Sequence, residues 1–86
     1  MDEIDEMVMD ALAERGGAVE AYAIRHYRFY RNTQEGTVQE CAVEITIDRR
    51  GHYNLSIMTE DNVEVSGNGA DSLQAALRVV HWNELP

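Results

Sequence analysis

The chain has 86 residues, with 16 acidic and 7 basic side chains and a net charge of −9 at pH 7. This length holds one small hydrophobic core, so we expect a single domain over residues 1–86. The negative charge disfavours nonspecific binding to nucleic acids or anionic membranes, and it favours a basic surface on any charged partner.

The composition also bears on class and location. Hydrophobic residues make up 44% of the chain, which argues against wholesale disorder. Cys41 is the only cysteine, so a disulfide-stabilised secreted scaffold is excluded. No apolar run approaches the roughly 18 residues of a membrane span, and the start Met1-Asp2-Glu3 has the wrong charge for a signal peptide. We therefore expect a cytoplasmic protein that does not bind membranes.

Residues 2–15 have the pattern of an amphipathic helix. Acidic residues fill the first turn and Arg15 lies in the last, as the helix dipole favours. Gly16-Gly17 is expected to end the helix. The residues at helical spacing, predicted to form one buried face, are Ile4, Met7, Val8, Ala11 and Leu12.

Residues 20–31 fit either a strand or a helix, and their aromatic and β-branched side chains favour a strand. The alternation of a strand then divides them between two faces. One face would carry Tyr22, Ile24, His26, Arg28 and Tyr30. The other would carry Ala21, Ala23, Arg25, Tyr27, Phe29 and Arg31. Neither face is cleanly apolar.

Three further strands follow the polar loop 32–37. Residues 38–48, 53–58 and 63–66 alternate apolar and polar side chains, with a hairpin turn at 49–52 in which Gly51 supplies the positive φ. After the break at 67–69, Asp71 and Gln74 resemble a capping box. A helix ending near Trp82 follows, and its predicted buried stripe is Leu73, Ala76, Leu77 and Val80.

The order of these elements predicts an α+β fold of the form α-β-β-β-β-α. An antiparallel β-meander of three to four strands would have one apolar face, and the N-terminal and C-terminal helices would cover it in a small two-layer sandwich.

No residue pattern indicates an enzyme. Cys41 falls on the inward face of the strand 38–48, where a thiol behaves as a small hydrophobe, and the three histidines are scattered. No His or Cys pair has metal-ligand spacing. Gly67-Asn68-Gly69 lacks the Lys and Ser or Thr of a phosphate loop, which makes it a strand-to-helix turn. We expect no catalytic residues, no metal and no cofactor.

The segment Arg25–Arg31, here called the basic aromatic band, carries three arginines in an otherwise acidic chain. The arginines could pair with the acidic helix or with Glu40 and Glu44. Tyr27, Phe29, Tyr30 and Arg28 could instead form a protein-binding hot spot, in which Tyr and Arg are enriched. Binding to single-stranded nucleic acid is opposed by the net charge. A homodimer that joins the band of one subunit to the acidic helix of the other is a variant of these interpretations.

The predicted N-terminal helix also places four carboxylates on one side over about 16 Å. This acidic row consists of Glu3, Glu6, Asp10 and Glu14. The strand 38–48 adds Glu40, Glu44 and Asp48 on its outward face. Such rows could imitate a nucleic-acid backbone towards a basic partner. The alternative is that they are the ordinary solvated faces of an acidic protein.

Residues 41–80 resemble the β-β-β-α core of HicB-type antitoxins, which have a partial RNase-H-like fold. The resemblance rests on the alternating strand 43–47, the turn Gly51-His52-Tyr53 and the helix start from Gly69 to Leu77. It covers about half of the chain and implies the fold of this part. It assigns no functional residue.

We predict a small acidic, non-enzymatic protein that inhibits or modulates a protein partner with a basic surface. Such a protein would be a phage-encoded inhibitor of bacterial defence, for example an anti-CRISPR protein that acts on a nucleic-acid-binding partner. The alternatives are an antitoxin or immunity protein with a HicB-like core, or a structural oligomer subunit. The predicted binding residues are Arg25, Tyr27, Arg28, Phe29, Tyr30 and Arg31 of the basic aromatic band, together with the acidic row.

Overall fold

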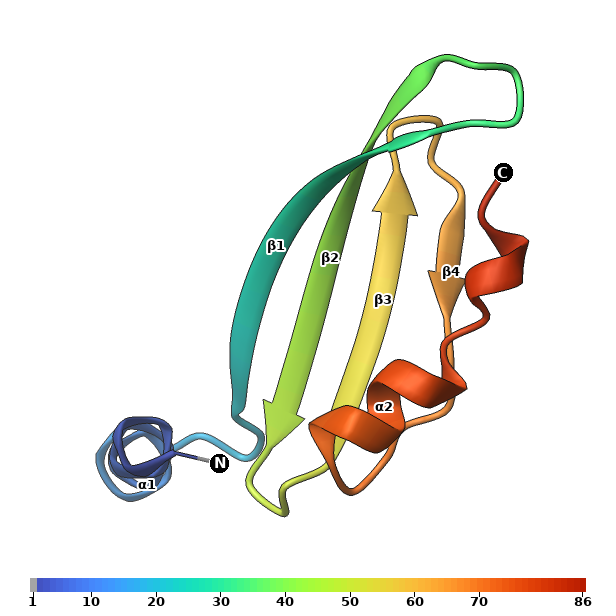
Figure 1. The fold of residues 1–86 in the computed structure, drawn as a ribbon. Coiled ribbons are helices and arrows are strands. Elements are labelled where there is room, and N and C mark those ends of the chain that lie inside the picture. The colour runs from blue at the N-terminus through green and yellow to red at the C-terminus, as the bar shows by residue number, and fades with distance from the viewer. Residues whose placement is uncertain (1) are drawn as a thin grey trace.

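A computed structural model describes residues 2–86 and confirms the α+β fold and its element order (Figure 1). The elements are α1 (Glu3–Arg15), β1 (Tyr22–Asn32), β2 (Val38–Asp48), β3 (Tyr53–Thr59), β4 (Glu64–Ser66), α2 (Leu73–Val79) and the 3-10 helix η1 (Trp82–Glu84). The segment 20–31, which fitted either a helix or a strand, is therefore a strand.

The four strands form one antiparallel sheet in the order β1-β2-β3-β4. β1 and β2 pair along their whole length, from Tyr22 opposite Asp48 to Asn32 opposite Val38. The predicted turn between β2 and β3 is confirmed, and Gly51 has a φ of 81°. The carboxylate of Asp48 accepts hydrogen bonds from the backbone N–H groups of Arg50 and His52, at 2.8 and 2.9 Å. This contact fixes the turn and hence the register of β2 and β3.

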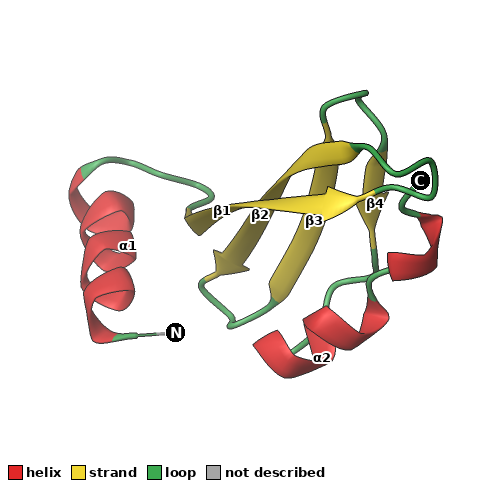
Figure 2. Ribbon diagram, turned by 45° about the horizontal axis from the view of Figure 1, so that its top comes forward, coloured by secondary structure: helices red, strands yellow, loops and turns green. Residues whose placement is uncertain are grey.

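The hydrophobic core lies on one face of the sheet, here called the inner face. Its buried side chains are Cys41, Ile45, Ile47, Leu55, Ile57 and Val65 from the strands and Val80 from the segment after α2. The alternation in β2 and β3 directs these residues to one side, as their sequence pattern predicts. α2 packs on this face over β3 (Figures 1 and 2).

α2 is shorter than predicted and differs at its start. It ends at Val79, and Trp82 begins the separate η1. Its N-cap is Ser72, whose hydroxyl accepts from the N–H of Ala75, whereas the predicted cap Asp71 instead lies 2.9 Å from His52 Nε2. Ser and Asp are equally good caps, so the sequence alone did not decide between neighbours.

The predicted buried stripe of α2 is only half buried. Ala76 and Val80 are buried, whereas Leu73 and Leu77 are 41% and 40% exposed. The helix is seven residues long and packs on β3. The inner surface of β1 and β2 beside Leu73 and Leu77 therefore stays uncovered by α2.

α1 begins and ends as predicted, with Asp2 as its N-cap and Gly16 as its C-cap. The predicted burial of its apolar face is wrong. Ile4, Met7 and Val8 are 74%, 67% and 53% exposed, while Met9, from another face of the helix, is buried. α1 lies beside the start of β1 at the edge of the sheet (Figure 2). Charged side chains that flank Met9 bind arginines of the sheet, and they orient the helix with its apolar face to solvent.

This placement makes the molecule elongated, with dimensions of 51 × 21 × 20 Å. A compact chain of this length has a radius of gyration of about 12 Å. The value here is 15.3 Å. Within residues 2–86, no helix combines the length and the apolar character needed to cross a membrane.

Candidate partner-binding surface

The basic aromatic band runs along β1, which is an edge strand, and the alternation of the strand divides it between two faces. Arg25, Tyr27, Phe29 and Arg31 pair across from Ile45, Val43, Cys41 and Gln39, and they share the inner face with these residues. His26, Arg28 and Tyr30 lie on the opposite, outer face. The six band residues predicted to bind a partner therefore do not form one continuous surface.

The inner-face arginines have partners within the chain. Arg25 Nη2 lies 2.9 Å from Asp2 Oδ2 and 3.4 Å from Asp5 Oδ2, both on the N-terminal part of α1. The hydrogen bond to Asp5 and the charge of that carboxylate raise the pKa of Arg25, and Asp2 adds to the effect. Arg31 donates to Gln39 Oε1 and to the carbonyl oxygen of Pro86. These contacts join the helix and the C-terminal end of the chain to β1.

On the outer face, Glu40 of β2 is the centre of a small polar cluster. Its Oε1 lies 3.3 Å from Arg28 Nε and accepts a 3.3 Å hydrogen bond from the Tyr30 hydroxyl. His26 Nδ1 lies 4.0 Å from Glu44 Oε2. All of these side chains are largely exposed, and exposed pairs contribute little to stability. The cluster orients Arg28 and Tyr30 without burying them.

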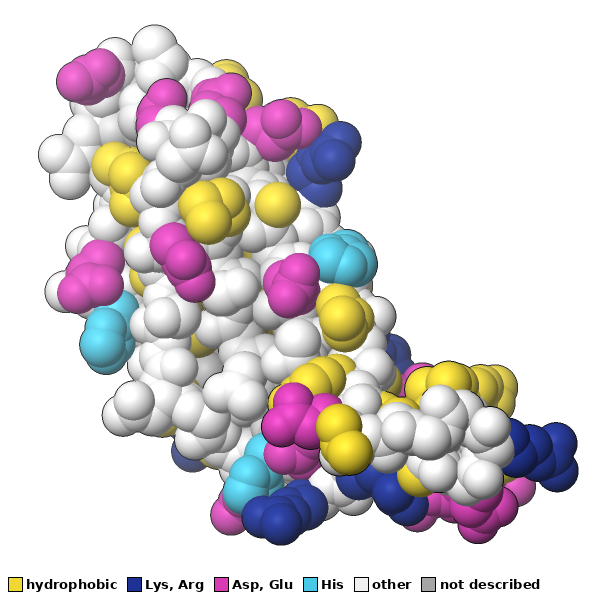
Figure 3. Space-filling model, turned by 180° about the vertical axis from the view of Figure 1, so that it is seen from behind, with side chains coloured by type: hydrophobic (Ala, Val, Ile, Leu, Met, Phe, Trp, Pro, Cys, Tyr) yellow, Lys and Arg dark blue, Asp and Glu magenta, His cyan; other side chains and the backbone are white. Residues whose placement is uncertain are grey.

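Large apolar side chains surround this cluster. Tyr30 is 64% exposed and Ile24 is 52% exposed, and Tyr22 and Met58 are also exposed. No helix within residues 2–86 covers the outer face, where hydrophobic side chains alternate with acidic ones and histidines (Figure 3). An uncovered surface that combines Tyr, Arg and aliphatic side chains has the composition of a protein interface.

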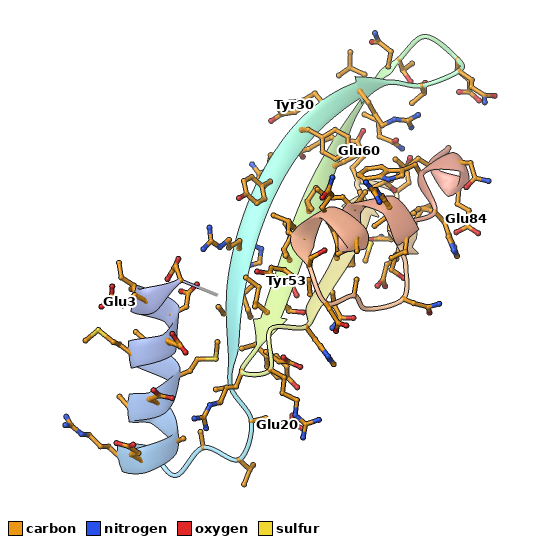
Figure 4. The ribbon with its side chains drawn as sticks, turned by 60° about the horizontal axis from the view of Figure 1, so that its bottom comes forward. Glu3, Glu20, Tyr30, Tyr53, Glu60 and Glu84 are labelled. Atoms are coloured by element: carbon orange, nitrogen blue, oxygen red, sulfur yellow. The ribbon has the colours of Figure 1, made fainter. Side chains whose placement is uncertain are left out.

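The acidic row on α1 is only partly free. Asp10 lies 2.9 Å from Arg49 Nη2 in the turn after β2. Within residues 2–86 no basic group lies within ion-pair distance of Glu3, Glu6 or Glu14. Figure 4 places Glu3 on α1 and Tyr30 far along β1, well apart. The acidic row and the outer face are therefore two separate surfaces.

The carboxylates of the second predicted row, on β2, have partners within the fold. Glu40 and Glu44 face Arg28 and His26. The hydrogen bond from the backbone N–H of His52, with a further one from Arg50, lowers the pKa of Asp48. The carboxylates of this strand are thus engaged within the fold, and they do not present a free row of charge.

The inner face holds an apolar groove of about 460 Å³ between β1–β2 and α2. It is lined by Tyr27, Phe29, Val43, Ile45, Leu55, Leu73, Leu77 and Trp82. Sequence reasoning missed this groove because it assigned Leu73 and Leu77 to the core. One signal for the groove was present in the sequence. Tyr27 and Phe29 occupy alternate positions of one strand, so both of these large side chains lie on the inner face of the sheet.

Two residues with reactive side chains, Cys41 and His52, make contacts within the fold. Cys41 is fully buried, and burial raises the pKa of its thiol. His52 lies 2.9 Å from Asp71 and 3.8 Å from Asp48, an exposed arrangement that holds the β2–β3 turn against the start of α2. Among residues 2–86, no group of three or more His, Cys, Asp or Glu side chains is arranged to hold a metal ion. Comparisons with protein families, curated proteins and solved structures found no match.

Proposed function

We propose that this protein is a non-enzymatic binding protein that inhibits or modulates a protein partner in the cytoplasm. The observation that carries the proposal is the uncovered outer face of the sheet, where Tyr30 is exposed next to Arg28 and Ile24 is exposed further along the same face of β1. Contact residues of this kind supply most of the binding energy in protein interfaces. Because Glu40 holds Arg28 and Tyr30 in place, the face is partly preorganised, which lowers the entropic cost of binding.

The partner is proposed to have a basic surface. The chain carries −9 at pH 7, and Glu3, Glu6 and Glu14 form an acidic edge on α1 that makes no ion pair with any other residue of the described segment 2–86. Such charges steer a basic partner towards the protein and increase the association rate. The finer proposal is a phage-encoded inhibitor of bacterial defence, of the anti-CRISPR type, acting on a nucleic-acid-binding protein. The alternatives are an antitoxin or immunity protein with a HicB-like core, and a structural oligomer subunit.

Affinity isolation from a host lysate, followed by binding measurements with the purified partner, tests this proposal. Tyr30→Ala and Arg28→Ala should each weaken binding by more than tenfold, as expected for hot-spot residues. Glu35→Lys, in the exposed loop between β1 and β2, is the control for a charge change outside the Arg28–Tyr30–Glu40 cluster.

The acidic row is tested separately. Reversing Glu3, Glu6 and Glu14 to lysine should slow association and reduce its dependence on salt. Unchanged affinity in both sets of variants would refute the proposed surfaces. The identity of the partner, whether a nuclease, a toxin or a structural protein, distinguishes the inhibitor from its alternatives.

A further inference from the structure

Within residues 2–86, two apolar surfaces are left open by the rest of the fold. One is the apolar stripe of α1, in which Ile4, Met7, Val8 and Leu12 are 74%, 67%, 53% and 44% exposed. The other is the apolar groove on the inner face, whose rim residues Tyr27, Leu73, Leu77 and Trp82 are 56%, 41%, 40% and 45% exposed. Exposed apolar surface of this extent indicates an interaction site.

α1 uses different faces for different contacts. Met9, Asp2 and Asp5 face β1, and Asp10 reaches Arg49. At 3.6 residues per turn, Ile4, Met7 and Ala11 lie roughly opposite Met9 on the helix, Val8 lies at about a right angle to it, and Leu12 lies about 60° from it. Most of the stripe therefore points away from the contact of Met9 with the sheet. The helix that carries it lies at one end of an elongated molecule (Figure 2).

The groove has the apolar lining that receives the apolar face of a helix. A hollow of about 180 Å³ extends it past Tyr27 and Leu73 towards Arg25. The lining of the main groove is entirely aromatic and aliphatic. Helix-in-groove recognition uses apolar side chains at i, i+3, i+4 and i+7 or i+8. Ile4, Met7, Val8, Ala11 and Leu12 have this spacing.

We infer that the occupant of the groove is α1 of a second copy of this chain. In a two-fold symmetric dimer, the stripe of each copy would lie in the groove of the other, so that one contact occurs twice. With on the order of 200 Å² for each large side chain, the exposed fractions correspond to about 800 Å² per contact and about 1,600 Å² for the pair, the size of a stable interface.

Other features of the chain agree with this occupant. The radius of gyration of 15.3 Å exceeds the value of about 12 Å for a compact chain of this length, as expected for half of a shared core. The linker Gly16–Ala21 sets α1 apart from the sheet, so a second copy can reach its apolar stripe. The acidic row beside the stripe would repel an anionic membrane. It would lie at the polar rim of the dimer contact.

Sedimentation of the purified chain across the micromolar range tests the dimer. The wild type should sediment at twice the mass of one chain. Val8→Glu and Leu77→Glu, at exposed positions on the stripe and the groove, should each shift it to a monomer with an unchanged circular dichroism spectrum. Val19→Glu adds the same charge at a fully exposed position in the linker and should remain a dimer. A monomeric wild type, or a dimer that both variants leave intact, would overturn the inference.

A cross-linking experiment tests the arrangement. Val8→Cys and Leu77→Cys proteins are mixed and oxidised, with the wild type as the control for the buried Cys41. A disulfide between the two different variants would support exchange between copies. A chain that carries both Val8→Cys and Leu77→Cys could instead be monomeric and form this disulfide within itself. That result would overturn the inference, since α1 would then cover the groove of its own chain. The stripe and the groove are distinct from the outer face, so the loss of the dimer and the loss of partner binding are separate results.

Discussion

The carboxylate of Asp2 makes two contacts, one that caps α1 and one that attaches α1 to the sheet. Its Oδ1 accepts a 2.8 Å hydrogen bond from the backbone N–H of Asp5, and its Oδ2 lies 2.9 Å from Nη2 of Arg25 on β1. The hydrogen bond from Asp5 is the main reason that the pKa of Asp2 is lowered, and the charge of Arg25 adds to the effect. One side chain therefore both caps the helix and attaches it to the sheet.

Removing Arg25 should loosen the attachment of α1. In Arg25→Ala, we expect amide hydrogen exchange in α1 to accelerate by a few fold, because Met9 and the Asp10–Arg49 pair would be the remaining anchors. Arg28→Ala is the matched control, since Arg28 pairs with Glu40 inside the sheet and does not touch α1. Equal exchange in wild type and Arg25→Ala would show that Met9 and the Asp10–Arg49 pair hold the helix without Arg25.

The sequence was sufficient for the sheet because each strand has a local signal. Alternation in β2 and β3 fixes which side chains are buried, and Gly51 fixes the turn that sets their register. The assignment of Arg25 and Arg28 to opposite faces of β1 also followed from alternation. Period and turn chemistry are local properties, so they can be deduced without knowing the rest of the fold.

The position of α1 could not be deduced in this way. Periodicity shows that Ile4, Met7 and Val8 share a face, but it does not say which surface that face meets. In the structure, Asp2, Asp5 and Met9 contact the sheet, so ion pairs from a neighbouring face of the helix decide its orientation. For the candidate site, composition was enough to identify the basic aromatic band. The groove exists because α2 covers only part of the sheet, and the sequence pattern did not show how far α2 extends.

Gly67 should tolerate no larger side chain. A Cβ at this position would meet the carbonyl oxygen of Val79 and would lie 2.6 Å from its carbonyl carbon, so the backbone at the end of α2 would have to move. We expect Gly67→Ala to lower the free energy of unfolding by about 1–3 kcal/mol, measured by urea denaturation. At Gly69 the nearest atom is Oδ1 of the Asn54 side chain, at 2.7 Å, which can rotate away. Gly69→Ala should therefore cost less, and the reverse order would contradict the packing of α2 on Gly67.

Cys41 should be inert in the folded protein. Its side chain is fully buried in the core, and burial raises the pKa of the thiol, so little thiolate forms and little reagent reaches it. We expect labelling by a thiol reagent at pH 8 to be at least about a hundredfold slower in the native protein than in denaturant, because it requires opening of the core. Rapid labelling of the native protein would show that β2 is accessible at its Cys41 end.

The carboxylate of Asp48 should make stability depend on pH in the acidic range. The backbone N–H of His52 holds its pKa below the ordinary value of 3.8, so the folded state favours the charged form. A group with a lowered pKa stabilises the fold above its unfolded pKa and loses this contribution as the pH falls through its folded pKa. Asp48→Asn keeps an oxygen that can accept from the same amides but removes the charge. The free energy of unfolding of the wild type should therefore exceed that of the variant at pH 7, and the difference should shrink below about pH 3.8.

Urea denaturation of both proteins at several pH values measures this difference. The other carboxylates are common to both chains, so their contributions largely cancel. Glu35→Gln, at an exposed loop position, controls for the removal of one negative charge from a chain of net charge −9. The difference in the free energy of unfolding between wild type and Asp48→Asn could instead stay constant from pH 7 to well below pH 3.8. Hydrogen bonds to a neutral oxygen would then hold the turn as well as hydrogen bonds to a charged one. The charge of Asp48 would then have no role in fixing the register of β2 and β3.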